Sequence, residues 1–443
     1  MKDRKVMIED FERLEDAILR LKRAEKELDD LKQFQDVFKP EMESIRGKLK
    51  QPSKVDQVEQ ELLKLKDRVR QYEQKQKETP VPATPSAAIF PAELGRLYCD
   101  VVLIGSGGFA RVFRAKRKKD NQDVAVKIPI SLDESTGRSF VKEISNWQRL
   151  NHRNVCKLYT VNIFPTPYLE IELCNGSLDD MAKPVGVEQA ANLMFQIADG
   201  VKHAHAQGVV HMDLKPQNIL LKGDNNVPVV SDWGLSKVAG ESKSSKLGGF
   251  TPKYAAPEQI SQKFGRTDYR TDIYQLGVVF YELVTGVLPH ESDEMTELMA
   301  QITMTEPKSP SLVHPEAAPV EPIIMKCLQK QMKDRYQSIL EMQKDLAEYL
   351  KIEFKESLGK SQGDMKRSRY YCAELCLVHL MMGDMGGALK YGRDLDRYAG
   401  EEAKRELAGI LKEVEFRTKE GQGTSEELVQ RVAVVLHQVK MGD

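Results

Sequence analysis

The segment Val209 to Leu221 reads VVHMDLKPQNILL and brings a carboxylate, an ammonium group and an amide close together, at Asp213, Lys215 and Asn218. Apolar residues on both sides predict a strand–loop–strand, which would gather these polar side chains on one tight loop. Asp213 can accept a proton from a hydroxyl nucleophile or orient it. Lys215 can neutralise a phosphoryl group during its transfer. The loop therefore carries groups suited to phosphoryl transfer.

Two oxygen-bearing side chains near this loop can hold a divalent cation. Asn218 can reach such an ion from the far side of the loop, and Asp232 in SDWGLS follows the next predicted strand. An amide and a carboxylate are hard oxygen ligands, and neither Cys nor His is among them, which favours Mg²⁺ over Zn²⁺. The sequence therefore predicts a Mg²⁺ site at Asn218 and Asp232.

A glycine-rich turn occurs earlier, where IGSGGFARV contains Gly105, Gly107 and Gly108, followed by Val112. Glycines let the backbone approach a ligand closely and direct N–H groups at phosphate oxygens. Taken alone, this stretch fits a plain glycine-rich hairpin.

The turn gains weight from Lys127, which lies in the otherwise apolar strand VAVKI. A buried ammonium group requires an anionic partner. Glu143, in the helical stretch SFVKEISNWQRL, can supply it. We therefore expect an ion pair between Lys127 and Glu143.

The elements that must position these residues are short strands followed by helices. From about Tyr98 the chain is β-rich, and after Cys174 it is helical apart from the strand–loop–strand. We therefore expect an α+β protein with a small β-rich lobe and a larger α-helical lobe. The expected divisions are a helical segment at 1–77, a proline-rich linker at 78–96, the two lobes at 97–173 and 174–352 (together 97–352), and a helical region at 353–443.

The first segment is charged and helical, and its apolar residues keep heptad spacing from Val55 to Tyr72, as in a coiled-coil seam. This pattern favours a homodimer through the N-terminal helices. An amphipathic hairpin that folds onto itself or onto a neighbouring domain is the alternative. The four prolines between Pro80 and Pro91 predict an extended, semi-rigid linker.

The C-terminal region reads as helix, Gly-Asp turn and helix, and resembles one tetratricopeptide unit through Gly383, Ala388 and Tyr391. A single unit cannot bury its own apolar face. We therefore expect a helical cap packed on the preceding domain. The segment from Glu426 to Lys440 predicts one more amphipathic helix.

Bulk composition narrows the class of protein further. Among 443 residues, 66 Lys and Arg balance 67 Asp and Glu for a net charge of -1, which argues against a nucleic-acid-binding protein. No apolar run approaches the roughly 20 residues that span a bilayer, and the N-terminus lacks the apolar core of a secretory signal. The six cysteines are scattered without a CxxC pair, which predicts reduced thiols and a cytoplasmic location.

Taken in order, these elements resemble the eukaryotic-type Ser/Thr protein kinase family. The matching motifs are the glycine-rich loop, the VAVK strand, the helical glutamate, HMDLKPQN, DWG and AAPE. The resemblance runs from about Tyr98 to Leu350, and it implies the bilobal kinase fold with ATP and Mg²⁺ as cofactors. Lys215, two residues after Asp213, resembles the Ser/Thr members, so the implied substrate is a Ser or Thr hydroxyl of a protein.

The resemblance also implies roles for individual residues. Asp213 would be the catalytic base, Lys215 would steady the γ-phosphate, and Lys127 would hold the α- and β-phosphates. Asn218 and Asp232 would bind Mg²⁺. The implied nucleotide contacts are Ile104, Gly105, Ser106, Gly107, Gly108, Val112, Ala125, Lys127, Glu143, Glu172 and Cys174.

Other matching positions are implied to shape the site. Ile171 would guard the adenine pocket, and the backbone from Glu172 to Cys174 would bind the adenine edge. Glu258 would pair with Arg335, and Asp272 would hold the catalytic loop from below. These last two roles are structural rather than chemical.

Three residues depart from the family pattern. Ala110 replaces the third glycine of the loop, and Trp233 replaces Phe in DFG. Met212 replaces the Arg that usually precedes the base and commonly grips a phosphate on the activation segment. We therefore hypothesise that activity does not require phosphorylation of the activation segment.

Two groups of residues resemble metal sites. Cys372 and Cys376 lie one helical turn apart with His379 nearby, but no second ligand pair is visible, so buried core cysteines are favoured. The second group consists of His203, His205 and His211. The kinase resemblance implies that His211 is a packing residue under the catalytic loop and that His205 is a helix-end contact.

Two other functions compete with a protein kinase. A catalytically silent pseudokinase acting as a scaffold is disfavoured because the chemical residues are all present: Lys127, Glu143, Asp213, Asn218 and Asp232. A small-molecule kinase is disfavoured, less decisively, by the APE element and by the complete helical lobe that follows it.

Overall fold

The computed structural model describes residues 90–106, 110–130, 144, 146–162, 166–233, 237–238, 252–361, 363–398 and 401–441. The coiled-coil prediction for 1–77, and with it the homodimer, lies outside these residues, as does the linker up to 89. Residues 90–443 belong to one structural unit.

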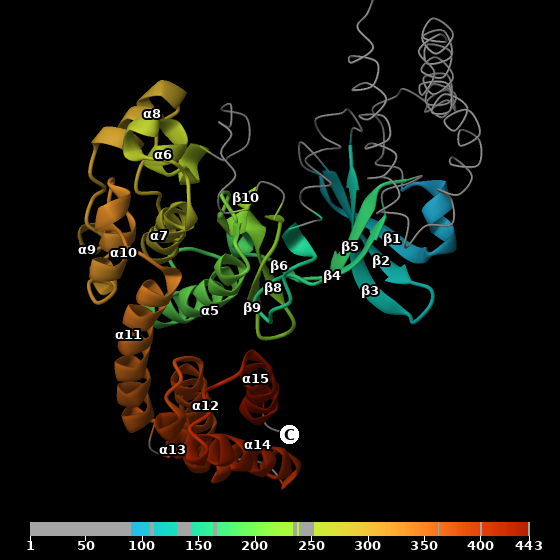
Figure 1. The fold of residues 1–443 in the computed structure, drawn as a ribbon, viewed down its shortest axis with the longest axis vertical. Coiled ribbons are helices and arrows are strands. Elements are labelled where there is room, and N and C mark those ends of the chain that lie inside the picture. Colours follow the sequence, from blue (N-terminus) through green and yellow to red (C-terminus); the bar gives the residue numbers. More distant parts are fainter. Residues whose placement is uncertain are drawn as a thin grey trace, which may run out of the picture. The chain divides into compact units, whose positions relative to one another are not determined.

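A five-stranded antiparallel sheet forms the small lobe (Figure 1). Its strands lie in the order β1–β2–β3–β5–β4. The strand register sets Lys127 opposite Val112 on one side and Leu169 on the other, in the middle of the sheet. The strands are β1 Tyr98–Ser106, β2 Ala110–Arg117, β3 Gln122–Pro129, β4 Leu158–Asn162 and β5 Tyr168–Glu172.

The end of the expected linker is part of this lobe. Residues Ala92–Arg96 form a 3₁₀ helix, and Leu94 is buried. The ring of Phe90 packs edge-on against Tyr98 and Phe113, with centroids 6.1 and 5.2 Å apart. The prediction of an extended linker to residue 96 therefore differs from the structure at 90–96. The reason is that the apolar side chains here find a sheet face on which to bury.

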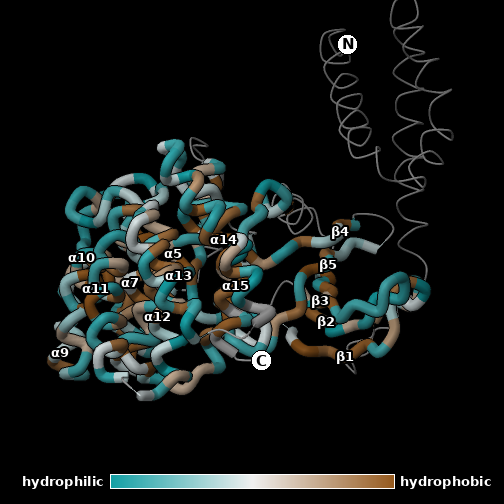
Figure 2. The backbone as a smooth tube through the Cα atoms, turned by 90° about the horizontal axis from the view of Figure 1, so that it is seen from below, coloured by the Kyte–Doolittle hydropathy of each residue, from teal (hydrophilic) through white to brown (hydrophobic). Residues whose placement is uncertain are grey.

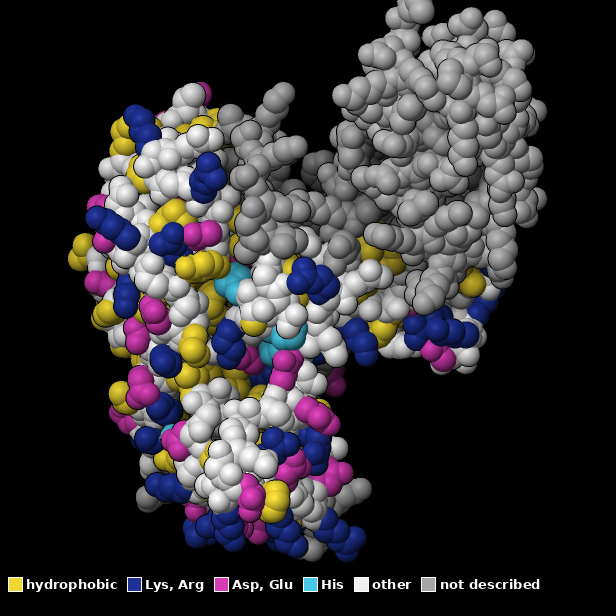
Figure 3. Space-filling view, in the orientation of Figure 1, with side chains coloured by type: hydrophobic (Ala, Val, Ile, Leu, Met, Phe, Trp, Pro, Cys, Tyr) yellow, Lys and Arg dark blue, Asp and Glu magenta, His cyan; other side chains and the backbone are white. Residues whose placement is uncertain are grey.

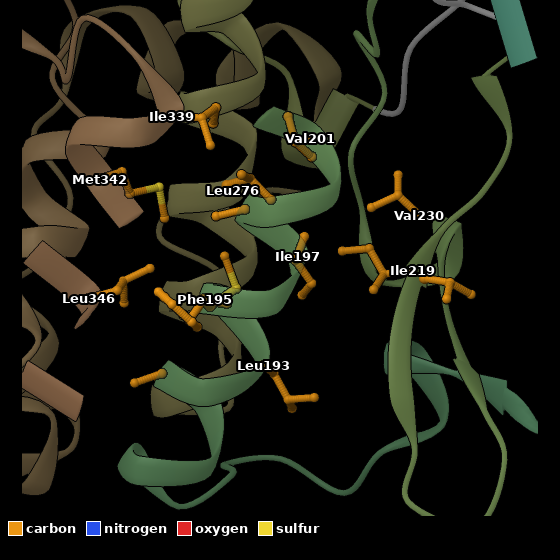
Figure 4. Close-up of a cluster of buried hydrophobic side chains, with 14 of the residues drawn as sticks. Leu193, Phe195, Ile197, Val201, Ile219, Val230, Leu276, Ile339, Met342 and Leu346 are labelled. Atoms are coloured by element: carbon orange, nitrogen blue, oxygen red, sulfur yellow. The ribbon is translucent and has the colours of Figure 1, made fainter. Parts of the chain in front are cut away.

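The larger lobe is helical, which together with the sheet confirms the predicted α+β class. In Figure 4, Ile197 points from the central helix α5 toward Ile219 and Val230, while Phe195 lies on the side of Leu346. All five side chains are buried. Figure 2 shows apolar segments both among the helices and along the strands of the small lobe. The helices are α5 Val187–Ala206, α6 Pro257–Ile260, α7 Tyr269–Thr285, α8 Met295–Met304, α9 Pro310–Val313, α10 Glu321–Cys327 and α11 Ile339–Lys360.

Short strands frame the loop at Asp213, so the predicted strand–loop–strand is present. The first of them pairs with a strand just beyond Asp232, and the others form a three-stranded sheet in the order β6–β8–β9. These strands are β6 Gly176–Ser177, β7 Val209–Val210, β8 Ile219–Lys222, β9 Val227–Val230 and β10 Lys237–Val238.

A glycine on α5 fixes the strand that leads to Asp232. A Cβ atom on Gly200 would come 2.5 Å from the carbonyl oxygen of Asn154, so only glycine lets that loop approach the helix. The same carbonyl accepts the N–H of Val230 at 2.9 Å, and the Asn154 side chain donates to the carbonyl of Pro228 at 2.8 Å. The loop thereby ties β9, and the Asp232 that follows it, to α5.

The C-terminal region contains the expected helix, Gly-Asp turn and helix. Gly383 has φ 77°, a conformation that favours glycine, and Asp384 caps the second helix by accepting the N–H of Gly387 at 2.9 Å. The expected amphipathic helix near the C-terminus is present as well. The likeness to a tetratricopeptide unit stays a prediction. The helices are α12 Met365–Met381, α13 Met385–Asp396, α14 Glu401–Lys419 and α15 Glu426–Met441.

These helices pack on the preceding lobe, as expected for a helical cap. Helix α12 packs against α11 and α15, and Figure 1 shows α11 leading directly into this group. Arg153 lies 2.7 Å from the sulfur of Met381, through its Nη2 atom. The Nδ1 atom of His203 on α5 lies 3.2 Å from the carboxylate of Glu426 on α15. The cap therefore contacts both α5 and the loop that precedes β4.

The cysteines of α12 belong to the core, in agreement with the favoured interpretation. Cys372 and Cys376 are 1% and 3% exposed, and the Cys376 thiol donates to the carbonyl of Ala388 at 3.3 Å. His379 pairs instead with Asp384, at 2.7 Å. Within the described residues, no group of three or more His, Cys, Asp and Glu side chains is arranged to hold a metal ion.

Two surface properties follow the composition. Among the helices that the structure describes, none combines the length and apolar character needed to cross a bilayer. Acidic and basic side chains are interspersed over the face shown in Figure 3.

Candidate active site

The loop between β7 and β8 holds its three polar side chains together. The Lys215 ammonium lies 2.8 Å from the Asp213 carboxylate. The Asn218 amide nitrogen donates to the Asp213 carbonyl at 2.8 Å and to its carboxylate at 3.2 Å. Asp213 and Asn218 are only 7% and 5% exposed, so both side chains are held within the lobe. The sequence-predicted constellation is thus assembled on one loop.

Asn218 also lies next to the strand end that carries Asp232. The carbonyl of Asn218 accepts the backbone N–H of Ser231 at 2.8 Å and its hydroxyl at 3.1 Å. The amide nitrogen of Asn218 is turned to Asp213, which leaves the amide oxygen as its donor atom for a cation. An amide oxygen beside a carboxylate suits Mg²⁺, so the residues present fit this ion.

Lys127 reaches from the small lobe to Asp232 in the larger lobe. Its Nζ atom lies 2.6 Å from the Asp232 carboxylate, and the two side chains are 14% and 42% exposed. Burial alone would raise the pKa of Asp232, but the charge and hydrogen bond of Lys127, together with the charges of His211 and Lys215, hold that pKa below its ordinary value. Asp232 is therefore ionised at neutral pH and able to bind a cation.

The expected adenine side lies along β3 and β5. Ile171 and Ala125 are register partners, and both are buried. The backbone N–H of Glu172 donates to the carbonyl of Lys157 at 2.8 Å. The carbonyl of Glu172 lies 3.9 Å from the Cys174 thiol. The same carbonyl lies 3.8 Å from the Cys156 thiol, so the backbone N–H of Glu172 is paired with a carbonyl while its own carbonyl has these two weak sulfur contacts.

The glycine-rich loop is described only in part. Gly105 and Ser106 pair with Val112 and Arg111 across β1 and β2. Ile104 is 51% exposed. Three of the expected nucleotide contacts, Gly107, Gly108 and Glu143, lie outside the described residues, so the Lys127–Glu143 ion pair stays a prediction.

Two supports expected beneath the loop are present. The Asp272 carboxylate accepts the backbone N–H groups of His211 and Met212, both at 2.8 Å. Arg335 makes two parallel hydrogen bonds to Glu258, at 2.7 and 2.8 Å. Helices α7 and α6 therefore hold the loop and the AAPE motif in place.

Comparison with known proteins decides the family. Residues 98–346, more than half of the chain, match the family described as "Protein kinase domain". The chain belongs to the protein kinase family. It is 31% identical over 267 residues to the serine/threonine-protein kinase Pkn1 of Myxococcus xanthus, which covers 56% of this chain and 38% of Pkn1. It is 30% identical over 262 residues to the serine/threonine-protein kinase PknB of Mycobacterium leprae, covering 55% and 41%. The chain thus spans about two fifths of the length of these curated relatives.

The histidines of this protein kinase have the packing roles that we favoured. The Nε2 atom of His211 lies 2.8 Å from the carbonyl of Ser231, its Nδ1 accepts the N–H of Asp213 at 3.2 Å, and its ring packs on Trp233. His205, near the end of α5, lies 2.7 Å from the Asp272 carboxylate. His211 therefore links the Asp213 loop to the DWG strand.

Sequence reasoning missed two glutamines that contact the catalytic loop of the kinase. Gln275 on α7 donates to the carbonyl of Met212 at 3.0 Å and accepts the N–H of Leu214 at 2.9 Å. Gln259 on α6 donates to the same carbonyl of Met212 at 2.9 Å. The available signal was Gln275 itself, an amide within the apolar helix TDIYQLGVVFYELV.

Proposed function

We propose that this chain is an ATP-dependent protein kinase that transfers the γ-phosphate to a Ser or Thr hydroxyl of a protein. The observation that carries the proposal is the contact of Lys127 with Asp232, 2.6 Å apart, beside a loop that holds Asp213, Lys215 and Asn218 together. The named Ser/Thr kinase relatives, at about 30% identity over the kinase domain, support the same acceptor class.

Each side chain has a role that its contacts support. Asp213 orients the acceptor hydroxyl and takes up its proton, and Lys215, which is 21% exposed, offers its charge to the phosphoryl group. Asn218 and Asp232 would hold Mg²⁺ through oxygen atoms, and Lys127 would hold the α- and β-phosphates. Mg²⁺-bound ATP supplies the activated phosphoryl group.

The remaining nucleotide contacts are assigned to residues of the neighbouring strands. Ala125 and Val112 would face the adenine ring of ATP, and the Glu172 carbonyl with the Cys174 backbone would bind the edge of that ring. Residues 104–108 would cover the phosphates and Glu143 would steady Lys127; of these, Gly107, Gly108 and Glu143 lie outside the described residues.

This function is tested by measuring the transfer of labelled γ-phosphate from ATP to a generic basic protein in the presence of Mg²⁺. Asp213→Asn should lower the rate by about 100-fold or more, because the group that accepts the proton is gone. Asp224→Asn, the same change on the exposed β8–β9 turn, is the matched control and should keep the parent rate. ATP binding without transfer by the parent protein would contradict the proposal and favour a pseudokinase scaffold. Phosphorylation of small molecules alone would favour a small-molecule kinase.

We also propose a homodimer through the N-terminal helices, supported by the heptad spacing from Val55 to Tyr72. Light scattering of the full chain should give twice the monomer mass, and Leu62→Lys in the heptad stripe should halve it. A monomeric parent would favour the intramolecular hairpin. The cytoplasmic location expected from the cysteines is likewise a proposal.

A further inference from the structure

The backbone around the proposed base is contacted on both sides by one side chain. Gln275 accepts the N–H of Leu214, the residue after Asp213, at 2.9 Å. It donates to the carbonyl of Met212, the residue before Asp213, at 3.0 Å. These two partners fix the orientation of the amide, because the opposite orientation would set oxygen against oxygen and nitrogen against N–H.

The conformation at Met212 requires such support. Its φ is 71°, in the left-handed region, where the Cβ atom of a residue other than glycine crowds the backbone. Asp272 holds the N–H of Met212, as described above. Gln275 and Gln259 together hold its carbonyl. The turn that presents Asp213 is therefore fixed by side chains from two helices.

The two glutamines also connect to each other and to the end of the activation segment. Gln275 donates to the side-chain oxygen of Gln259 at 3.1 Å, and that oxygen accepts the N–H of Ala256 at 2.9 Å. Gln259 belongs to α6, which the buried Glu258–Arg335 pair holds. A continuous polar network thus runs from α7 through the catalytic loop to α6.

We propose that Gln275 is a positioning residue for Asp213, and that through Gln259 it joins the catalytic loop to the activation segment without an Arg–phosphate contact. The inference rests on the proposed kinase function. It gives a physical reason for Met212 at the position where relatives with Arg would grip a phosphate: the carbonyl of that residue, rather than its side chain, makes the connection.

The test separates positioning from simple stabilisation by comparing two buried glutamines of the same lobe. Gln343 is 0% exposed, and it donates to Asp199 at 3.1 Å and accepts from Lys202 at 2.8 Å, without contacting the catalytic loop. Gln275→Leu and Gln343→Leu each remove at least two side-chain hydrogen bonds of a buried amide, to backbone groups in the first case and to charged side chains in the second. Both should lower the thermal midpoint.

Only Gln275→Leu should lower kcat, by about 100-fold, because a displaced base loses its alignment with the hydroxyl. The dissociation constant for ATP should stay within about twofold of the parent value for both variants, since neither glutamine touches the nucleotide residues. Equal kcat values for Gln275→Leu and Gln343→Leu would overturn the inference while leaving the kinase function standing.

Gln275→Glu provides a second readout that does not depend on the folding of the leucine variant. A neutral carboxylic acid can accept the Leu214 N–H and donate to the Met212 carbonyl, whereas a carboxylate cannot donate. The kcat of Gln275→Glu relative to the parent should therefore recover as pH falls, and a pH-independent ratio would count against the inference.

If the parent transferred no phosphate, the kinase function would fail first. Amide hydrogen exchange at Leu214 would then decide the positioning role, since Gln275→Leu should lose protection there and Gln343→Leu should not.

Discussion

Two acidic side chains, Glu258 and Glu426, hold parts of this kinase together, one in the buried interior and the other at the solvent-exposed surface. The side chains of Glu258 and Arg335 are both 0% exposed and form a bidentate ion pair inside the larger lobe. Glu426 is 41% exposed and joins α15 to His203, at 3.2 Å. Water and salt reach the second contact and not the first. The contact inside the lobe is therefore shielded from solvent, whereas the contact with the C-terminal cap can respond to salt and pH.

The chemistry of His203 makes the second contact dependent on pH. Burial lowers the pKa of His203, and the nearby His152 lowers it further, while Glu426 and Asp199 act in the opposite direction. The neutral ring fits its partners: one nitrogen donates to Glu426, and Nε2 accepts the N–H of Asn151 at 3.4 Å. A second proton on the ring would remove the acceptor for Asn151.

Breaking the buried pair should have the largest effect on stability. Glu258→Gln leaves the Arg335 charge buried without a counter-ion, so the free energy of unfolding should fall by about 3–5 kcal/mol. Urea denaturation measures this. Glu356→Gln, which breaks the exposed pair with Lys360, is the control and should leave the midpoint unchanged; equal effects of the two variants would contradict the contrast.

Breaking the exposed contact should cost less. Glu426→Gln keeps the shape of the side chain and removes its charge, so the unfolding free energy at neutral pH should fall by about 1 kcal/mol or less. The loss should appear as faster amide exchange in α15 rather than in α7. If Glu426→Gln lowered the free energy of unfolding as much as Glu258→Gln, the expected difference between the exposed and the buried contact would be wrong.

Acidification sharpens the same comparison. Because the folded state depresses the pKa of His203 below 6.5, the stabilisation is complete above that pH and is lost as pH falls through the folded-state pKa. Proteolysis within α15 should therefore accelerate on acidification before the kinase lobes unfold. Glu426→Gln should enlarge this acid sensitivity, since it removes a carboxylate that favours the imidazolium. The prediction would be contradicted if proteolysis within α15 and within α7 accelerated equally as the pH falls.

The smallest expected effect is that of phosphatase treatment. If buried side chains alone fix the catalytic loop, removal of phosphate from the activation segment should leave kcat within about twofold of the untreated value. Phosphate analysis before and after treatment is the control. Abolished activity would show that a phosphate contact holds the loop after all.

The grouping of the candidate site residues could be predicted largely from the sequence, because they lie close together in the chain or in ordered motifs. Asp213, Lys215 and Asn218 share one loop, and the roles of Asp272 and of the Glu258–Arg335 pair came with the family pattern. The α+β class followed from the switch between short strands and helices.

The supporting contacts could not be predicted, because they depend on how distant segments meet. Gln275 lies 63 residues from Met212, and Glu426 lies 223 residues from His203. The local pattern of apolar and polar residues does not indicate such contacts between distant segments. Gln275 is visible in the sequence as an amide within an apolar helix, but its partners on the loop are a backbone carbonyl and a backbone N–H, which have no signature in the sequence.

The aromatic anchor at Phe90 ties the beginning of the small lobe to the glycine-rich turn. Its ring packs edge-on against Tyr98 on β1 and Phe113 on β2. Strand β1 ends at Ser106 and β2 begins at Ala110, on either side of that turn. A displacement of Phe90 would therefore act directly on the two strands that flank the proposed phosphate-binding turn.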